Sequence, residues 1–152
     1  MAITPNTDFS VGQVLTAAQA NYWPRGIFTY NEVTASDSFT VEEVQITSSS
    51  FTAVANRYYK ITYFEPNLNN TVDANTTMRV RLTNLTGTLL GATYAFTRAG
   101  SFSSTGILVV YTTFTAGSKT VVATTQSTVG TTTATRDADF RAFLSIEDVG
   151  TA

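Results

Sequence analysis

The side chains in this sequence that could do acid–base chemistry are three pairs of carboxylates. They are Glu42 with Glu43, Asp137 with Asp139, and Glu147 with Asp148. Adjacent residues of a strand point to opposite faces, which argues against the first and third pairs meeting at one substrate, as a glycosidase requires. The middle pair could share a face, but arginines at positions 136 and 141 flank it, which favours a surface ion-pair cluster. We therefore predict no catalytic site from these carboxylates.

Other catalytic arrangements lack the residues they need. The sequence has no histidine and no cysteine, which removes Ser–His–Asp and Cys–His catalysis, the usual zinc ligands and disulfide bonds. Ser118 and Lys119 are adjacent, but they lie in a turn pattern between two strands. Asp73 is the only carboxylate among the asparagines of residues 67–77, whereas a calcium loop needs several oxygen ligands. We predict that the protein is not an enzyme and holds no cofactor and no metal ion.

Charge is scarce on this chain and threonine is abundant. Of the 152 residues, 13% are charged and about a fifth are threonine, against a usual charged share of roughly 25%. Threonine suits a strand and can face water, so we expect it to cover surface at outward strand positions such as Thr62 and Thr83. Low charge also fits an assembly of many copies, in which repeated like charges would repel each other.

Nucleic acid and membranes are not favoured as partners. The net charge is −2 and no basic stripe is present. No apolar run approaches the roughly 18 residues needed to span a bilayer. The first eight residues lack the basic and apolar regions of a signal peptide, so we expect the protein to be made and folded in a cytoplasm.

Residues 1–24 predict an N-terminal arm with a short helix, and residues 25–152 predict a β-sandwich domain. The first eleven residues are polar and lack periodicity, so we expect them to be extended. Thr16 and Gln19 then have the spacing of a helix-capping box, with alanines between and after them. We expect a helix of two turns at most, ended by Pro24.

Two groups of aromatic residues each have two interpretations. Tyr22 and Trp23 form a large apolar pair after the helix, which we expect to cap one end of the β domain or to anchor in a neighbouring subunit. The four aromatic residues of the segment 58–64 could stack on sugar rings or on a partner chain. A place in the core or at a subunit interface is the interpretation that we favour for this segment.

From Arg25 onward the pattern predicts eight or nine strands and no long helix. The clearest period-two alternation covers residues 78–82, and polar loops are expected over residues 65–77 and 126–136. The segment 107–114 begins apolar on both faces, which is typical of a central strand or of one that faces a neighbouring subunit. Short strands at this spacing predict an antiparallel sandwich or a closed barrel.

Four segments of the chain carry a resemblance. They are Phe9–Asn21, Pro24–Gly26, Phe51–Ile61 and the ending Phe143–Ala152. Together they resemble a loosely defined family of small structural proteins of tailed bacteriophages, over nearly the whole chain. The resemblance implies a jelly-roll β-sandwich that assembles on virions, commonly as a trimer. It brings no catalytic motif, and the family's roles include head decoration, tail and fibre modules.

Our leading hypothesis is a non-enzymatic virion protein, a homotrimer that decorates and cements a capsid assembled in the cytoplasm of a host bacterium. Its partners would be itself and the major capsid protein or other virion proteins, since each trimer would bridge neighbouring capsomers. The expected interface residues are Tyr22, Trp23, Ile107, Val109 and Tyr111. The alternative is a tail or fibre receptor-binding module for host surface glycan, with the polar loops at its tip. A carbohydrate-active enzyme is a third and less favoured interpretation.

Overall fold

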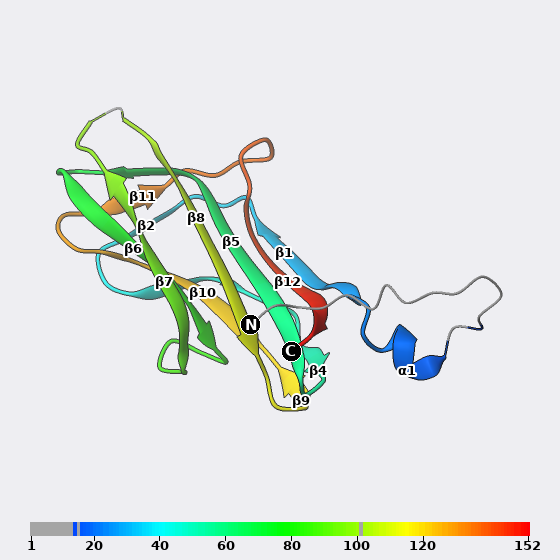
Figure 1. The fold of residues 1–152 in the computed structure, drawn as a ribbon. Coiled ribbons are helices and arrows are strands. Elements are labelled where there is room, and N and C mark those ends of the chain that lie inside the picture. Colours follow the sequence, from blue (N-terminus) through cyan, green and yellow to red (C-terminus); the bar gives the residue numbers. More distant parts are fainter. Residues whose placement is uncertain (1–13, 15, 101) are drawn as a thin grey trace.

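β-Branched and aromatic residues alternate with polar ones along most of the chain, and these segments form β-strands (Figure 1). The computed structural model describes residues 14, 16–100 and 102–152. The described residues contain twelve strands, four of which are only three residues long. In chain order they are β1 (Gly26–Val33), β2 (Asp37–Phe39), β3 (Glu43–Thr47), β4 (Phe51–Ala53), β5 (Arg57–Asn70), β6 (Ala74–Leu82), β7 (Leu89–Thr97), β8 (Ser104–Thr113), β9 (Gly117–Lys119), β10 (Val121–Ser127), β11 (Thr132–Ala134) and β12 (Ala142–Thr151).

The longer strands form two antiparallel sheets, which we name after their central strands. The β5 sheet has the order β1-β12-β5-β8, and the short strands β11 and β2 continue it beside the far end of β5. The β6 sheet has the order β3-β10-β6-β7, and β4 pairs with β9 separately. When only the eight longer strands are counted, the two orders are 1-8-3-6 and 2-7-4-5, the connectivity of a jelly roll. The predicted antiparallel jelly-roll sandwich is confirmed.

The core fills the space between the two sheets with alternate residues of each strand. Tyr59 and Tyr63 of β5 point inward and are fully buried, as are Met78 and Val80 of β6. The alternation predicted for residues 78–82 is therefore confirmed. The favoured interpretation of the aromatic strand, a place in the core, is correct for these two tyrosines.

A buried ion pair joins the β5 sheet to the segment that leads into β12. Arg136 donates to the Glu65 carboxylate from Nη2 at 2.6 Å and from Nε at 3.0 Å, and both side chains are almost fully buried. The same guanidinium donates to the carbonyl of Ala35 and to the side-chain oxygen of Gln45. Burial and the Glu65 carboxylate, which accepts the Tyr63 hydroxyl hydrogen bond, raise the pKa of Tyr63 well above its ordinary value.

A second buried ion pair holds the chain that enters the sandwich. One helical turn, α1 (Ala17–Ala20), precedes this segment, where the sequence predicts a helix of up to two turns. The Arg57 guanidinium pairs with the Asp148 carboxylate of β12 and donates to the backbone carbonyls of Asn21 and Trp23. Two carbonyls that follow the helical turn are thereby satisfied by a side chain that is itself fixed by a carboxylate.

The two aromatic side chains of this segment are not a buried cap. Tyr22 and Trp23 are 56% and 48% exposed, although Arg57 holds the backbone beside them. The prediction that they close one end of the β domain is therefore wrong. The hydrogen bonds from Arg57, which we call the Arg57 clamp, fix the backbone of this segment and leave the two rings at the surface. Residues 1–11, predicted to be extended, lie outside the described residues.

Of the polar segments predicted as long loops, residues 65–77 are mostly strand and residues 126–136 are partly strand. In the segment 65–77, only the three residues after Asn70 lie between β5 and β6, and β11 occupies part of the segment 126–136. The Asn70 amide explains this, because its Nδ2 donates to the hydroxyls of Ser127 and Thr132, both at 2.9 Å. The Asn70 side chain has both roles, since its Oδ1 accepts the Val72 N–H at 3.1 Å in the turn and its Nδ2 ties three neighbouring strands together.

Threonine fills inside positions as well as outside ones. Thr76, Thr97 and Thr132 are fully buried, and the hydroxyls of Thr76 and Thr132 lie 2.8 Å apart in a hydrogen bond. Thr62 lies on the outer side of the β5 sheet, as predicted, but its neighbours bury it. Threonine therefore replaces surface charge only in part, because its paired hydroxyls also suit the interior.

Candidate functional site

None of the three carboxylate pairs forms a catalytic pair. Glu42 receives hydrogen bonds from Arg81 at 2.8 and 3.2 Å, and Asp148 is neutralised by Arg57 inside the sandwich. Asp137 accepts the backbone N–H groups of the second and third residues that follow it, both at 2.8 Å, and so caps a turn. The expected surface ion-pair cluster around Asp137 is replaced by this turn.

Two other kinds of reactive arrangement are also absent from the described residues. No group of three or more acidic side chains gathers there in a way that could hold a metal ion. Ser118 and Lys119 have separate partners, the hydroxyls of Ser50 at 2.7 Å and Thr115 at 3.0 Å. Within the same residues, no helix has the length and apolar character needed to cross a membrane.

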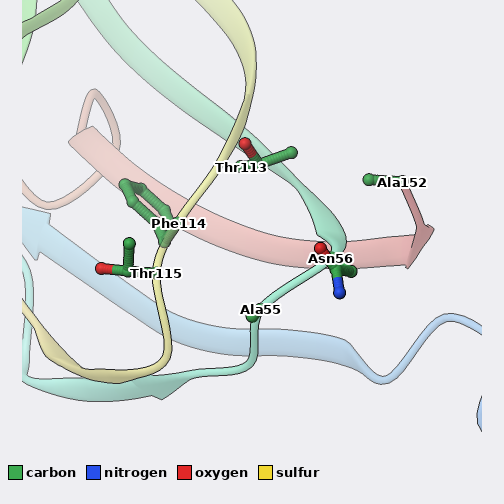
Figure 2. A pocket seen from close by; sticks show the side chains of 6 residues that line it. All are labelled: Ala55, Asn56, Thr113, Phe114, Thr115 and Ala152. Atoms are coloured by element: carbon green, nitrogen blue, oxygen red, sulfur yellow. The ribbon is translucent and has the colours of Figure 1, made fainter.

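A shallow pocket lies at the end of the sandwich where β5 begins (Figure 2). Its volume is about 440 Å³ and it opens to solvent. Its lining residues are Ala55, Asn56, Thr113, Phe114, Thr115 and Ala152. None of these side chains is ionisable, so the pocket offers no side chain for acid–base catalysis.

A row of aromatic rings crosses the outer side of the β5 sheet. The rings of Tyr30 on β1 and Phe143 on β12 stack with their centroids 5.4 Å apart, and Phe143 stacks on Phe64 of β5 at 5.2 Å. Ile107 of β8 lies directly opposite Phe64 on the far side of that strand. One apolar row thus spans four neighbouring strands. Phe143, Phe64 and Ile107 lie in register, and Tyr30, which is opposite Ser145, reaches Phe143 diagonally.

The next two rows of this surface are also partly apolar. Val109 lies opposite Thr62, and Tyr111 lies opposite Lys60. Lys60 forms an ion pair with Glu147 of β12 at 3.3 Å, so the charges in this region compensate each other. We call the outer side of the β5 sheet the apolar face, with the members Tyr30, Lys60, Thr62, Phe64, Ile107, Val109, Tyr111, Phe143 and Glu147.

Three of the five predicted interface residues lie together on the apolar face. Ile107, Val109 and Tyr111 alternate along β8 and are 58%, 44% and 62% exposed. Within the described residues β8 pairs with β5 alone, so it is an edge strand of its sheet rather than a central one. Tyr22 and Trp23 belong instead to the segment that Arg57 clamps.

The sequence interpretation missed Tyr30 and Phe143 as members of the apolar face. Each lies at an outward position of its strand, but nothing in a single strand shows that the two rings stack. Their neighbourhood depends on the register of β1 against β12, which includes a bulge between Ile27 and Thr29.

A polar network lies on the outer side of the other sheet, the β6 sheet. Two arginines hold the Glu42 carboxylate, Arg81 at 2.8 Å and Arg79 at 3.3 Å, and the Thr124 hydroxyl donates to it at 2.7 Å. Arg79 also donates to Gln126 Oε1 at 3.0 Å. Partial burial opposes ionisation of Glu42, but the hydrogen bonds from Arg81 and Thr124 and the two arginine charges keep its pKa below the ordinary value. We call these five residues the polar network.

No protein-family model and no curated protein matches the sequence. Among solved structures, the module CsCBM6-3 of Clostridium stercorarium, in complex with cellobiose, aligns at 16% identity and a TM-score of 0.35, covering 80% of this chain and 94% of that one. A CBM4 structure aligns at 10% identity and a TM-score of 0.37, and the alignment covers 81% of this chain and 94% of that one. The VP2 subviral particle of infectious bursal disease virus aligns at 11% identity and a TM-score of 0.41, covering 85% of this chain and 38% of that one. Similarities this low do not identify a ligand or partner of this chain.

Proposed function

We propose that the protein is a non-enzymatic structural protein of a bacteriophage virion, which assembles as a homotrimer through its apolar face and decorates the capsid. In this proposal each trimer bridges neighbouring capsomers of the major capsid protein and so stabilises the head. The observation that carries the proposal is the exposed row of Ile107, Val109 and Tyr111 beside a stacked aromatic row. Contiguous apolar surface of this kind marks an interaction site in a soluble protein.

The ring geometry favours a protein partner for the apolar face. Tyr30, Phe143 and Phe64 are stacked at interplanar angles of 29° and 24°, so their faces are turned toward one another. A sugar ring would need an open aromatic face, whereas protein side chains pack well against ring edges and against Ile107 and Val109. Burial of such surface contributes roughly 25 cal/mol per Å² of apolar area, less the cost of association.

The low charge of the chain and its resemblance to phage structural proteins support the virion setting. Charged residues make up 13% of the sequence, and the charged pair on the apolar face, Lys60 with Glu147, is internally compensated. A surface of this composition can meet copies of itself without like-charge repulsion. The trimeric state and the capsid location rest on the resemblance.

Light scattering on the purified full chain tests the assembly. We expect a mass three times that of the 16.4 kDa chain for the wild type. Tyr111→Ser and Val109→Lys should lower this mass at micromolar concentration. The matched control is Tyr94→Ser, which removes the same side chain at 68% exposure from the outer side of the β6 sheet and should leave the mass unchanged. A monomeric wild type at high concentration would contradict the trimer.

Mass spectrometry of separated heads and tails from phage particles tests the location. Recovery with the heads supports decoration of the capsid, and recovery with tails alone would contradict it. The alternative function, a receptor-binding module, requires a glycan site in loops over residues 65–77 and 126–135. Much of both segments is strand, and the Asn70 amide is used internally, so that alternative needs another surface.

A further inference from the structure

An exposed tyrosine ring stands beside the polar network. Tyr94 projects from the edge strand β7 at 68% exposure, and the register places it opposite Thr77 of β6. Gln126 of β10 lies opposite Thr77 on the other side. Among the described residues Tyr94 stacks on no other ring, unlike Tyr30, Phe64 and Phe143 of the apolar face.

The floor between the ring and the network consists of small side chains. Thr77 separates Tyr94 from Gln126, and Ala92 is the neighbour of Arg79 on β7. Tyr94 and Gln126 stand two strands apart, which is about 9.6 Å at the usual strand spacing. Thr77 is itself only 4% exposed, so a pyranose ring would lie over the side chains that cover it, between Tyr94 and the polar network.

The charge of the network favours an acidic ligand. Arg79 and Arg81 carry two positive charges against the single carboxylate of Glu42. Within the described residues, the hydrogen bond of Arg79 to Gln126 and its ion pair with Glu42 both use Nη1, which leaves Nη2 and Nε to donate to a ligand. That pair of donors matches a carboxylate, which a guanidinium binds through two parallel hydrogen bonds.

The network is also held in place before any ligand arrives. Glu42 is bonded by two arginines and a threonine hydroxyl, and Arg79 is fixed from two sides by Glu42 and Gln126. Side chains ordered in this way lose little further conformational freedom on binding, which favours recognition.

We propose that this surface binds an acidic saccharide, a pyranoside that carries a carboxylate. The carboxylate pairs with Arg79, the sugar ring packs against Tyr94, and the Gln126 amide donates to a ring hydroxyl. The site lies on the β6 sheet, so it is separate from the apolar face and does not depend on the assembly proposed above.

Calorimetric titration of the full chain at low salt tests the site, with pentagalacturonate as the acidic probe and cellopentaose as the neutral one. We expect the acidic pentamer to bind and the neutral one not to bind. Tyr94→Ala should weaken binding about tenfold, and Arg79→Gln should weaken it between about tenfold and a hundredfold. Tyr111→Ala, a matched tyrosine truncation at 62% exposure on the opposite sheet, should leave the affinity unchanged. Unchanged thermal unfolding of each variant shows that it remains folded.

Three results would overturn this inference. They are no binding of pentagalacturonate at millimolar concentration, equal binding of cellopentaose, and undiminished binding by a folded Tyr94→Ala variant. Light scattering on the same variants distinguishes a failure of saccharide binding from a failure of the homotrimer to assemble. The Tyr94 change should affect the titration alone, and the Tyr111 change should affect the mass alone.

Discussion

Replacing Arg136 by methionine should destabilise the protein strongly, because it leaves the Glu65 carboxylate buried without a counter-ion. Arg136 donates twice to this carboxylate, at 2.6 and 3.0 Å, and neither side chain reaches solvent to any useful extent. Removing one partner of such a pair costs about 3–5 kcal/mol. The carbonyl of Ala35 and the amide oxygen of Gln45 also lose their donor, which places the expected loss in the upper part of that range.

A double-mutant cycle shows whether this loss comes from the pair itself. Glu65→Leu should also cost about 3–5 kcal/mol, since it leaves a buried guanidinium unpaired. The double variant should be about 1–3 kcal/mol more stable than the sum of the two single losses predicts. Urea unfolding followed by circular dichroism measures each free energy of unfolding. In thermal scans the single variants should melt roughly 8–16 °C below the wild type.

Two outcomes would refute this reasoning about the buried pair. One is a loss below about 1 kcal/mol for Arg136→Met, which would mean that water reaches Glu65 in the folded protein. The other is strict additivity in the cycle, which would mean that the two side chains stabilise the fold independently.

Three further predictions concern single positions. Gly106→Ala should cost about 1–3 kcal/mol in urea unfolding, because a Cβ there would lie 2.2 Å from the Met78 sulfur in a filled core, and an unchanged midpoint would contradict this. Burial works against ionisation of Glu42, but its hydrogen bonds and its arginine neighbours lower its pKa in the folded protein. The ionised carboxylate therefore stabilises the fold above the pKa that Glu42 has in the unfolded chain, about 4.3, and this stabilisation is lost as the pH falls below that pKa. The difference in stability between wild type and Glu42→Gln should therefore shrink in acid, and a constant difference from pH 7 to pH 3 would count against the network. Burial and a neighbouring carboxylate raise the pKa of Tyr63 in the folded protein. The stability gained from its neutral phenol should therefore decline as the pH rises above the pKa of tyrosine in the unfolded chain, about 10. The phenolate absorbance that Tyr63→Phe removes should then appear only as the protein unfolds, and its appearance in the folded protein would disprove the assignment.

The β-sandwich could be predicted from the sequence because alternation is a property of single strands. Residues 78–82 show which side chains point inward without any knowledge of the neighbouring strands, and their burial agrees. The outward set on β8, Ile107, Val109 and Tyr111, could be found in the same way. Its place at the edge of a sheet could not, because strand order is decided by contacts far apart in the sequence.

The errors concern polar residues whose partners lie elsewhere in the chain. Asn70 has the composition of a turn, and it becomes a strand residue because Ser127 and Thr132 accept its amide hydrogens. The clamp formed by Arg57 could not be predicted, because its partners Asp148 and Trp23 are distant from it in the sequence. The polar network was missed for the same reason, since Glu42 is brought to two arginines of β6 by the path of the chain before β3.

The Arg57 clamp also decides how this domain can be attached to other polypeptides. Its guanidinium bonds both the segment by which the chain enters the sandwich and the strand by which it leaves. A protein fused before Asn21 or after Ala152 would therefore emerge at the same pole (Figure 1). The turn after β5 lies at the opposite pole, roughly 45 Å away along fourteen residues of strand. Cargo fused directly before Asn21 or after Ala152 would leave that far pole unobstructed, which makes the domain a practical scaffold for display.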